Sequence, residues 1–268
     1  MQKKYEKLGF VLIGQHRQGA DLKTKVMSLA RSQKINYTIT QGGNVPGDTS
    51  SGIPHAFLFD WTGKCVAEGH PNELYKKVDE LMAKAPPWIT GGKTLEDAEV
   101  QKIAAGLRSP RGYGKALESL DKLSKAEGKQ GLEATYLADR LRNYGLSLLA
   151  NAQEAESEDA LNALTGYAEI ASLYKGHEIG DKAAARIKEL KKDKDFKNEL
   201  KAAKMLAAIE SLTGQFKAYG GQVNLDHPAN RKPAQQIMKI LKLLQKKYGD
   251  TKAAAKAREA VAPYGIGG

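Results

Sequence analysis

The chain of 268 residues contains a single cysteine, Cys65, and this limits the chemistry that it can perform. One cysteine cannot form an intrachain disulfide, a two-cysteine redox cycle, a zinc knuckle or an iron–sulfur site. No apolar run reaches the ~20 residues that a membrane-spanning helix needs. Residues 1–20 show no secretory signal pattern. We therefore expect no membrane span, and the sequence points to no cofactor and no metal.

Aromatic residues are also scarce, at 7%, which leaves little stacking surface for single-stranded nucleic acid. Positive charge is plentiful, with 42 basic and 31 acidic residues and a net charge of +11, which favours anionic partners without naming one. Residues 1–90 hold 12 basic and 8 acidic side chains, so the excess is spread over both halves of the chain. Residues 231–258 hold nine basic residues and one acid, and Lys239, Lys242 and Lys246 fall near one helix face. Such a face suits phosphate or anionic lipid, although a solvated helix face is the commoner interpretation.

Prolines and glycines predict two parts joined by a linker over residues 85–95. Pro86-Pro87 stops a helix, and Gly91-Gly92 leaves the chain flexible. Residues 1–84 combine short β-branched runs with helical periodicity, which predicts a small α/β domain. Residues 96–268 are rich in alanine and contain no proline between Pro110 and Pro228, which predicts an all-helical domain.

The first part shows the order β-α-β, loop, β-β-α. A tight turn over residues 60–63 predicts a hairpin between its last two strands. Asn72 is the expected N-cap of the last helix, and Asp21 that of the first. We expect strands over 9–14, 36–40, 56–59 and 64–67, a loop over 42–52, and helices over 21–34 and 72–83.

The helical part contains an internal repeat at an offset of 74 residues. Tyr174 corresponds to Tyr248, and the residues around each predict a helix, a tight turn and an alanine-rich helix. Helical hairpins of this kind bury their faces by stacking on neighbours, so we expect a tetratricopeptide-like arrangement. An ordinary helical bundle with a chance similarity is the alternative. The matching positions are Tyr167 and Leu241, Ile170 and Leu244, Lys182-Ala183 and Lys256-Ala257, and Ile187 and Val261.

The sequence GIPHAFLFDWTGKCVA, residues 52–67, resembles the C-terminal half of thioredoxin-like proteins, most closely the redoxin and thiol:disulfide reductase type. In that family a Gly-Val-Pro-type loop precedes a hydrophobic strand, an Asp-x-x-Gly-Lys turn and the last strand. The resemblance implies that Pro54 is the family's cis-proline, that the backbone of Ile53 pairs with an extended substrate chain, and that His55 lies beside this loop. A trans proline that begins a strand is the alternative for Pro54.

The chain departs from the family because it shows neither the first strand nor the Cys-x-x-Cys helix that follows it. In the family this strand is central and lies between the strands that correspond to residues 9–14 and 56–59. Three explanations are open: the protein begins upstream of Met1, the two strands pair directly, or another chain fills the gap. We favour the first, which implies an in-frame Cys-x-x-Cys upstream and allows an extracytoplasmic or periplasmic location.

No catalytic residue is assigned within this chain. Cys65 lies where the family has an aliphatic residue on the last strand, facing in or on an edge, so we expect a structural cysteine; a redox-active Cys65 is the alternative. The five histidines show no metal-ligand spacing. The favoured function is that of a thioredoxin-family redox protein, inactive without the missing cysteines. The alternatives are a non-catalytic interaction scaffold, which would bind protein partners through the helical domain, and a basic surface for nucleic acid or another polyanion.

Overall fold

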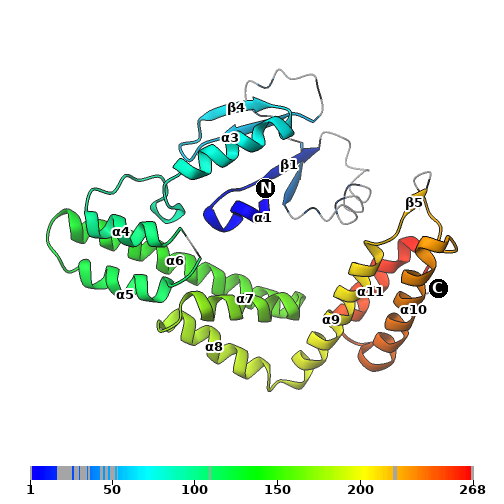
Figure 1. Cartoon of the computed structure of the whole chain (residues 1–268). Helices are drawn as coiled ribbons and strands as arrows, with labels where there is room; N and C mark the ends of the chain where they lie inside the picture. The colour runs from blue at the N-terminus through cyan, green and yellow to red at the C-terminus, as the bar shows by residue number, and fades with distance from the viewer. Residues whose placement is uncertain are drawn as a thin grey trace. The chain divides into compact units, whose positions relative to one another are not determined.

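The computed structural model describes residues 2–16, 26, 30, 35, 37–42, 45, 48, 52, 54–108, 110–219 and 222–266, and this part of the chain is mostly helical (Figure 1). The chain folds into two compact units. The first comprises Met1–Asp21, Asn36–Gly145 and Ser172–Glu178, and the second comprises Leu22–Ile35, Leu146–Ala171 and Ile179–Gly268.

The predicted strands are present, in two separate pairs. β1(Ile13–His16) runs parallel to β2(Thr38–Gln41), and β3(Ala56–Phe59) runs antiparallel to β4(Cys65–Gly69). The first strand begins at Ile13 rather than at residue 9, because the preceding segment is tied back to the N-terminal turns. The amide of Phe10 donates to the Tyr5 carbonyl at 3.1 Å, and the amide of Leu12 donates to the Gln2 side chain at 3.0 Å. These turns are α1(Gln2–Tyr5) and η1(Glu6–Leu8).

The helix expected over 72–83 is confirmed as α3(Pro71–Lys84), but its N-cap is His70 rather than Asn72. The His70 ring nitrogen accepts the Asn72 amide at 3.3 Å, and proline occupies the first helical position, where no amide is needed. Leu74 and Val78 are buried against Leu58 of β3. Of the helix expected over 21–34, only Val26 and Ala30 are described, and both are helical. Most of the loop expected over 42–52 lies outside the described residues.

Within the segment expected to be a linker, residues 88–90 pack inside the first unit. η3(Trp88–Thr90) buries Ile89 and Thr90 completely or nearly so. From α6(Lys129–Glu158), the Arg140 guanidinium donates to the Ile89 carbonyl at 2.6 Å, and the Tyr136 hydroxyl donates to the Thr90 carbonyl at 3.0 Å. The apolar residues between the prolines and the glycines explain this packing. A domain division over 85–95 stays a prediction, although the first unit runs across it.

An aromatic cluster in the first unit joins Trp88 to three tyrosines. The Trp88 and Tyr144 ring centroids lie 4.6 Å apart, and the Tyr113 ring centroid lies 5.5 Å from that of Tyr174. The Tyr174 hydroxyl donates to the Leu141 carbonyl at 2.7 Å, and burial raises the pKa of Tyr174. The helices around this cluster are α4(Ala98–Gly106), α5(Tyr113–Leu123), α6 and the end of α7(Ala160–Leu173).

In the second unit, a core of alanine, leucine and isoleucine joins α9(Lys194–Thr213), α10(Pro228–Tyr248) and α11(Lys252–Val261). Buried Asn230 fixes the chain that enters α10. Its side-chain oxygen accepts the Lys217 amide at 2.7 Å, and its amide group donates to the Lys217 and Asn224 carbonyls at 2.9 and 2.8 Å. These bonds hold the short hairpin of β5(Ala218–Tyr219) and β6(Gln222–Val223) against the helix.

Two glutamates bind the N-terminal amides of helices distant in sequence. Buried Glu133 accepts the Glu96 amide at 2.9 and 3.1 Å and the Asp97 amide at 3.0 Å, just before α4. Glu199 accepts the amides of Lys252 and Ala253 at 2.9 and 2.7 Å, at the start of α11. Each carboxylate satisfies amides that have no partner within their own helix, and its charge suits the positive end of the helix dipole.

The repeat is confirmed at the level of secondary structure. α7 is followed by α8(Glu178–Leu190), and α10 is followed by α11, each pair across a tight turn. The same bond closes both turns: the His177 amide donates to the Tyr174 carbonyl, and the Thr251 amide donates to the Tyr248 carbonyl, both at 3.0 Å. Tetratricopeptide-like stacking stays a prediction.

Candidate functional site

The hairpin turn that carries the family resemblance is held by Asp60. Its carboxylate accepts the Thr62 and Lys64 amides at 2.8 and 3.1 Å and the Thr62 hydroxyl at 2.6 Å. The hydroxyl bond is the largest cause of a lowered pKa for Asp60. Gly63 adopts a φ of 85°, in the left-handed region that favours glycine. The predicted hairpin is therefore confirmed, and each specified position of Asp-x-x-Gly-Lys has a structural role in the turn.

The expected substrate loop lies at the other end of this hairpin. Pro54 and His55 are exposed, directly before β3, and the His55 ring contacts the Phe57 ring edge-on with centroids 5.0 Å apart. Ile53 lies outside the described residues, so the form of the Ile53–Pro54 peptide bond stays a prediction. The exposed position of Pro54 and His55 suits the binding of an extended chain.

Of the two positions considered for Cys65, the inward-facing one is not found, because the side chain is exposed. Its Sγ lies 3.5 Å from the Ala67 carbonyl oxygen. It pairs with Phe59, four residues along β3 from His55, which corresponds to about 13 Å of strand. The structure therefore does not bring the lone cysteine and the expected substrate loop together. β4 is exposed at its Cys65 end. The sequence pattern of residues 64–67 does not indicate which face of this strand is buried.

The two strand pairs remain separate in the described residues: β1 pairs only with β2, and β3 only with β4. Direct pairing of β1 with β3, one of the three explanations considered above, is not found there. Large apolar side chains are exposed on or beside these strands, including Val11, Ile13, Phe59 and Val66. Strand edges with apolar neighbours favour pairing with a further strand.

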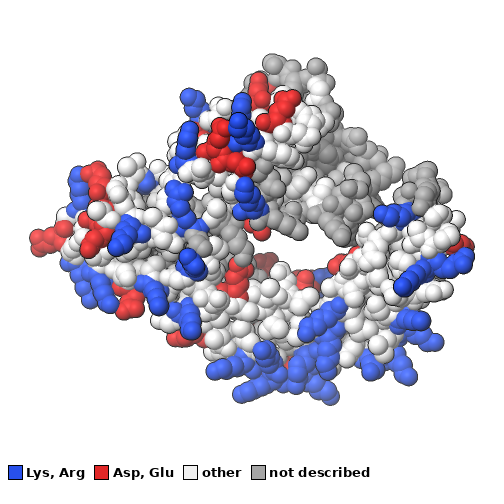
Figure 2. Space-filling model, viewed as in Figure 1, with Lys and Arg blue, Asp and Glu red and all other residues white. Residues whose placement is uncertain are grey.

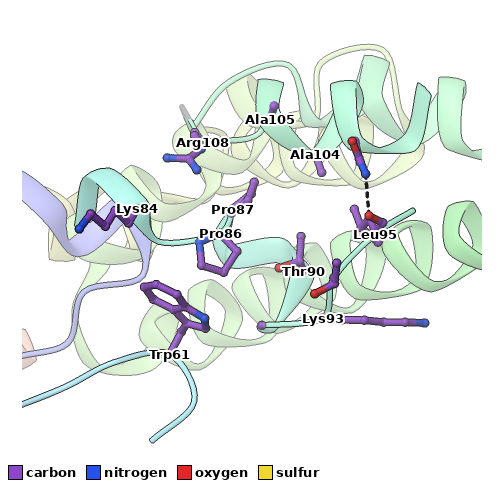
Figure 3. Close-up of a pocket in the computed structure, with 13 residues that line it drawn as sticks. Trp61, Lys84, Pro86, Pro87, Thr90, Lys93, Leu95, Ala104, Ala105 and Arg108 are labelled. Atoms are coloured by element: carbon purple, nitrogen blue, oxygen red, sulfur yellow. Dashed lines mark hydrogen bonds between the residues drawn. The ribbon is translucent and has the colours of Figure 1, made fainter. Parts of the chain in front are cut away.

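A shallow pocket of about 380 Å³ lies where the hairpin turn meets η3 and α4 (Figure 3). The Trp61 ring, Pro86, Thr90 and Leu95 give it a largely apolar wall, and the Thr90 hydroxyl is buried without a hydrogen-bond partner among the described residues. The side chain of Lys93 runs away from the pocket, and its Nζ lies over the Tyr136 ring at 4.6 Å. Lys84 and Arg108 also line the pocket, which can therefore accept a small apolar group beside basic side chains; its lining contains no histidine, cysteine or carboxylate.

A cluster of paired polar side chains in the second unit is structural. Glu156 accepts two bonds from Arg186, at 2.9 and 2.6 Å, and one from the Tyr167 hydroxyl at 2.6 Å. The Arg186 bonds hold the pKa of Glu156 below its ordinary value. Burial, followed by the bond to Glu156, raises the pKa of Tyr167 to about 12. These groups keep one protonation state near neutral pH and therefore serve the packing of α6, α7 and α8.

No grouping of three or more histidine, cysteine, aspartate or glutamate side chains suitable for a metal ion occurs in the described residues. Within the same residues, every helix is too short or too polar to cross a membrane. No protein-family model, no curated protein and no solved structure matches this chain.

Proposed function

We propose that residues 1–84 form part of a thioredoxin-like domain of the redoxin type, and that the chain binds protein substrates for thiol–disulfide exchange. The cysteines that carry out such an exchange are absent from these 268 residues. Exchange requires a thiolate that attacks a disulfide and a second thiol that resolves the mixed disulfide. The role of this chain in the proposal is therefore substrate binding.

One observation carries the proposal: the order and direction of the elements around Pro54. The parallel strands β1 and β2 come first, and Pro54 directly precedes β3. An Asp-x-x-Gly-Lys turn then leads to β4, which is antiparallel to β3, and α3 packs on Leu58 of β3. The separation of the two strand pairs also agrees with a sheet that lacks its central strand. Fold alone does not establish function, so the substrate loop must be tested directly.

The test uses binding of a reduced and alkylated unfolded polypeptide, measured by fluorescence anisotropy. The variant Ile53→Pro removes the backbone amide that the proposal pairs with the substrate, whereas the matched control Ile53→Ala keeps that amide. We expect Ile53→Pro to weaken binding about tenfold, the equivalent of about 1.4 kcal/mol, and Ile53→Ala to weaken it far less. Circular dichroism checks that both variants fold. Equal binding by both variants, or no binding by the wild-type chain, would overturn the proposal.

A further inference from the structure

The basic excess of the chain lies almost entirely in its last third. Residues 179–268 hold 19 basic and 9 acidic side chains, a net charge of +10, whereas residues 1–178 hold 23 and 22. This is compatible with the similar net charges of the two halves of the chain, because residues 91–178 hold 11 basic and 14 acidic side chains. The basic segment forms α8 to α11, within the second unit. Figure 2 shows Lys and Arg side chains gathered where α8 meets α9, and others over the region of α10.

Two helices of this segment each carry four exposed lysines on one face. At 3.6 residues per turn, each set falls within a sector of about 80°. On α10 this sector lies opposite the buried residues Ile237, Leu241 and Leu244. The lysine stripe of α9 comprises Lys194, Lys197, Lys201 and Lys204, and that of α10 comprises Lys232, Lys239, Lys242 and Lys246.

Three acids near these lysines have other partners. Glu199 binds the amides at the start of α11, Asp193 accepts the Phe196 amide at 2.6 Å, and Glu189 pairs with Arg186. Lys252 and Lys256 are paired with Glu158, so they do not add to the free charge. α10 itself contains no acidic residue. Neither lysine stripe has an ion-pair partner among the described residues.

The two stripes differ in their apolar neighbours. In the described part of residues 179–268, the large hydrophobic side chains that are exposed are Met238 and Leu243, at 49% and 44%. Both belong to α10, and helical geometry places them at the two borders of its lysine stripe. Lysines around exposed apolar side chains are typical of surfaces that lie on anionic membranes, where the apolar groups enter the headgroup region. Nucleic-acid phosphates offer these apolar groups no favourable contact.

We propose that the exposed face of α10 binds the surface of an anionic phospholipid membrane. Lys232, Lys239, Lys242 and Lys246 contact lipid phosphates and carboxylates, and Leu243 and Met238 enter the headgroup layer. The helix remains packed on the protein core through its opposite face. This surface is independent of the substrate loop at Pro54.

The test measures sedimentation of the whole chain with vesicles of phosphatidylcholine, alone or with about 30% phosphatidylserine, at about 0.1 M salt. Because one lysine near an anionic surface is worth about a fivefold change in partitioning, replacing the four α10 lysines with glutamine should lower binding about 100-fold or more. The same replacement of the four α9 lysines removes equal charge and serves as the matched control. It should lower binding less than about tenfold, because α9 contributes only long-range attraction.

The variant Leu243→Gln separates headgroup insertion from charge alone. It should lower binding several-fold, and the loss should persist when salt screens the lysines. All substituted positions are exposed, and circular dichroism checks that the helices are retained. Three results would each overturn the proposal: equal losses for the α9 and α10 variants, equal binding to both kinds of vesicle, or binding to duplex DNA in preference to the anionic vesicles.

Discussion

Replacement of Glu133 by glutamine tests whether the start of α4 depends on a carboxylate from α6. Glutamine keeps the shape of the side chain but replaces one acceptor oxygen with an NH₂ group. The Glu96 amide lies 2.9 and 3.1 Å from the two carboxylate oxygens, so the new NH₂ group, itself a donor, faces that amide whichever oxygen it replaces, and the oxygen that remains to accept the Glu96 and Asp97 amides carries no charge. Because a hydrogen bond to a charged group contributes about 1.5–3 kcal/mol, we expect a loss of about 2–3 kcal/mol.

Both tryptophans of the chain, Trp61 and Trp88, lie in the same unit as Glu133, so their fluorescence during urea unfolding reports on that unit. With an m-value of about 2 kcal/mol/M, the expected loss moves the midpoint down by about 1 M. Glu118→Gln is the control, because Glu118 forms only an exposed i,i+4 pair with Lys122, worth less than about 0.5 kcal/mol. A Glu133→Gln midpoint equal to that of the control would refute the assignment of Glu133 as a long-range cap.

Three further predictions address charge, redox activity and association. Because the pKa of Glu156 is lowered in the folded protein, its bonds to Arg186 stabilise the fold above the ordinary carboxyl pKa, and this stability is lost as the pH falls through the lowered pKa. In a plot of thermal midpoint against pH, Glu156→Gln should therefore show a smaller decrease at acid pH than the wild-type chain. An equal decrease in both proteins would contradict this. We expect the chain not to accelerate the reduction of insulin by dithiothreitol, and sustained acceleration that survives Cys65→Ser would contradict the thioredoxin-like assignment. Ile13→Lys should reduce self-association measured by sedimentation velocity, because a charge on the exposed strand β1 discourages pairing of its edge with another chain. Equal self-association of the wild-type chain and the variant would contradict association through this strand edge.

The sequence predicts those features whose cause is local. The Asp60 turn, the α3 helix and the two helix pairs of the repeat all follow from turn chemistry or from periodicity within about ten residues. His70 is missed as a cap because histidine rarely takes that role, although Pro71 at the next position was an available signal. The sequence leaves open whether Cys65 faces inward, because a strand pattern alone does not say which face is covered.

Features that depend on contacts distant in sequence are not predicted. The packing of residues 88–90 needs Tyr136 and Arg140, which lie more than 40 positions later. The caps supplied by Glu133 and Glu199 join residues 36 to 54 positions apart, and nothing in the local sequence marks either glutamate. The lysine stripes are visible in the sequence, but only the structure shows that they form no ion pair with an acid among the described residues.

The same backbone bond closes the turn at His177 and the turn at Thr251, so each helix pair with its turn is a candidate unit for duplication or deletion. Each bond lies wholly within its own copy, so a copy carries its turn with it when it is duplicated or deleted. Gain or loss of one whole unit preserves every turn, whereas gain of a single helix would leave one apolar face uncovered. Length differences among descendants of this gene should therefore come in steps of one helix pair with its connecting segment.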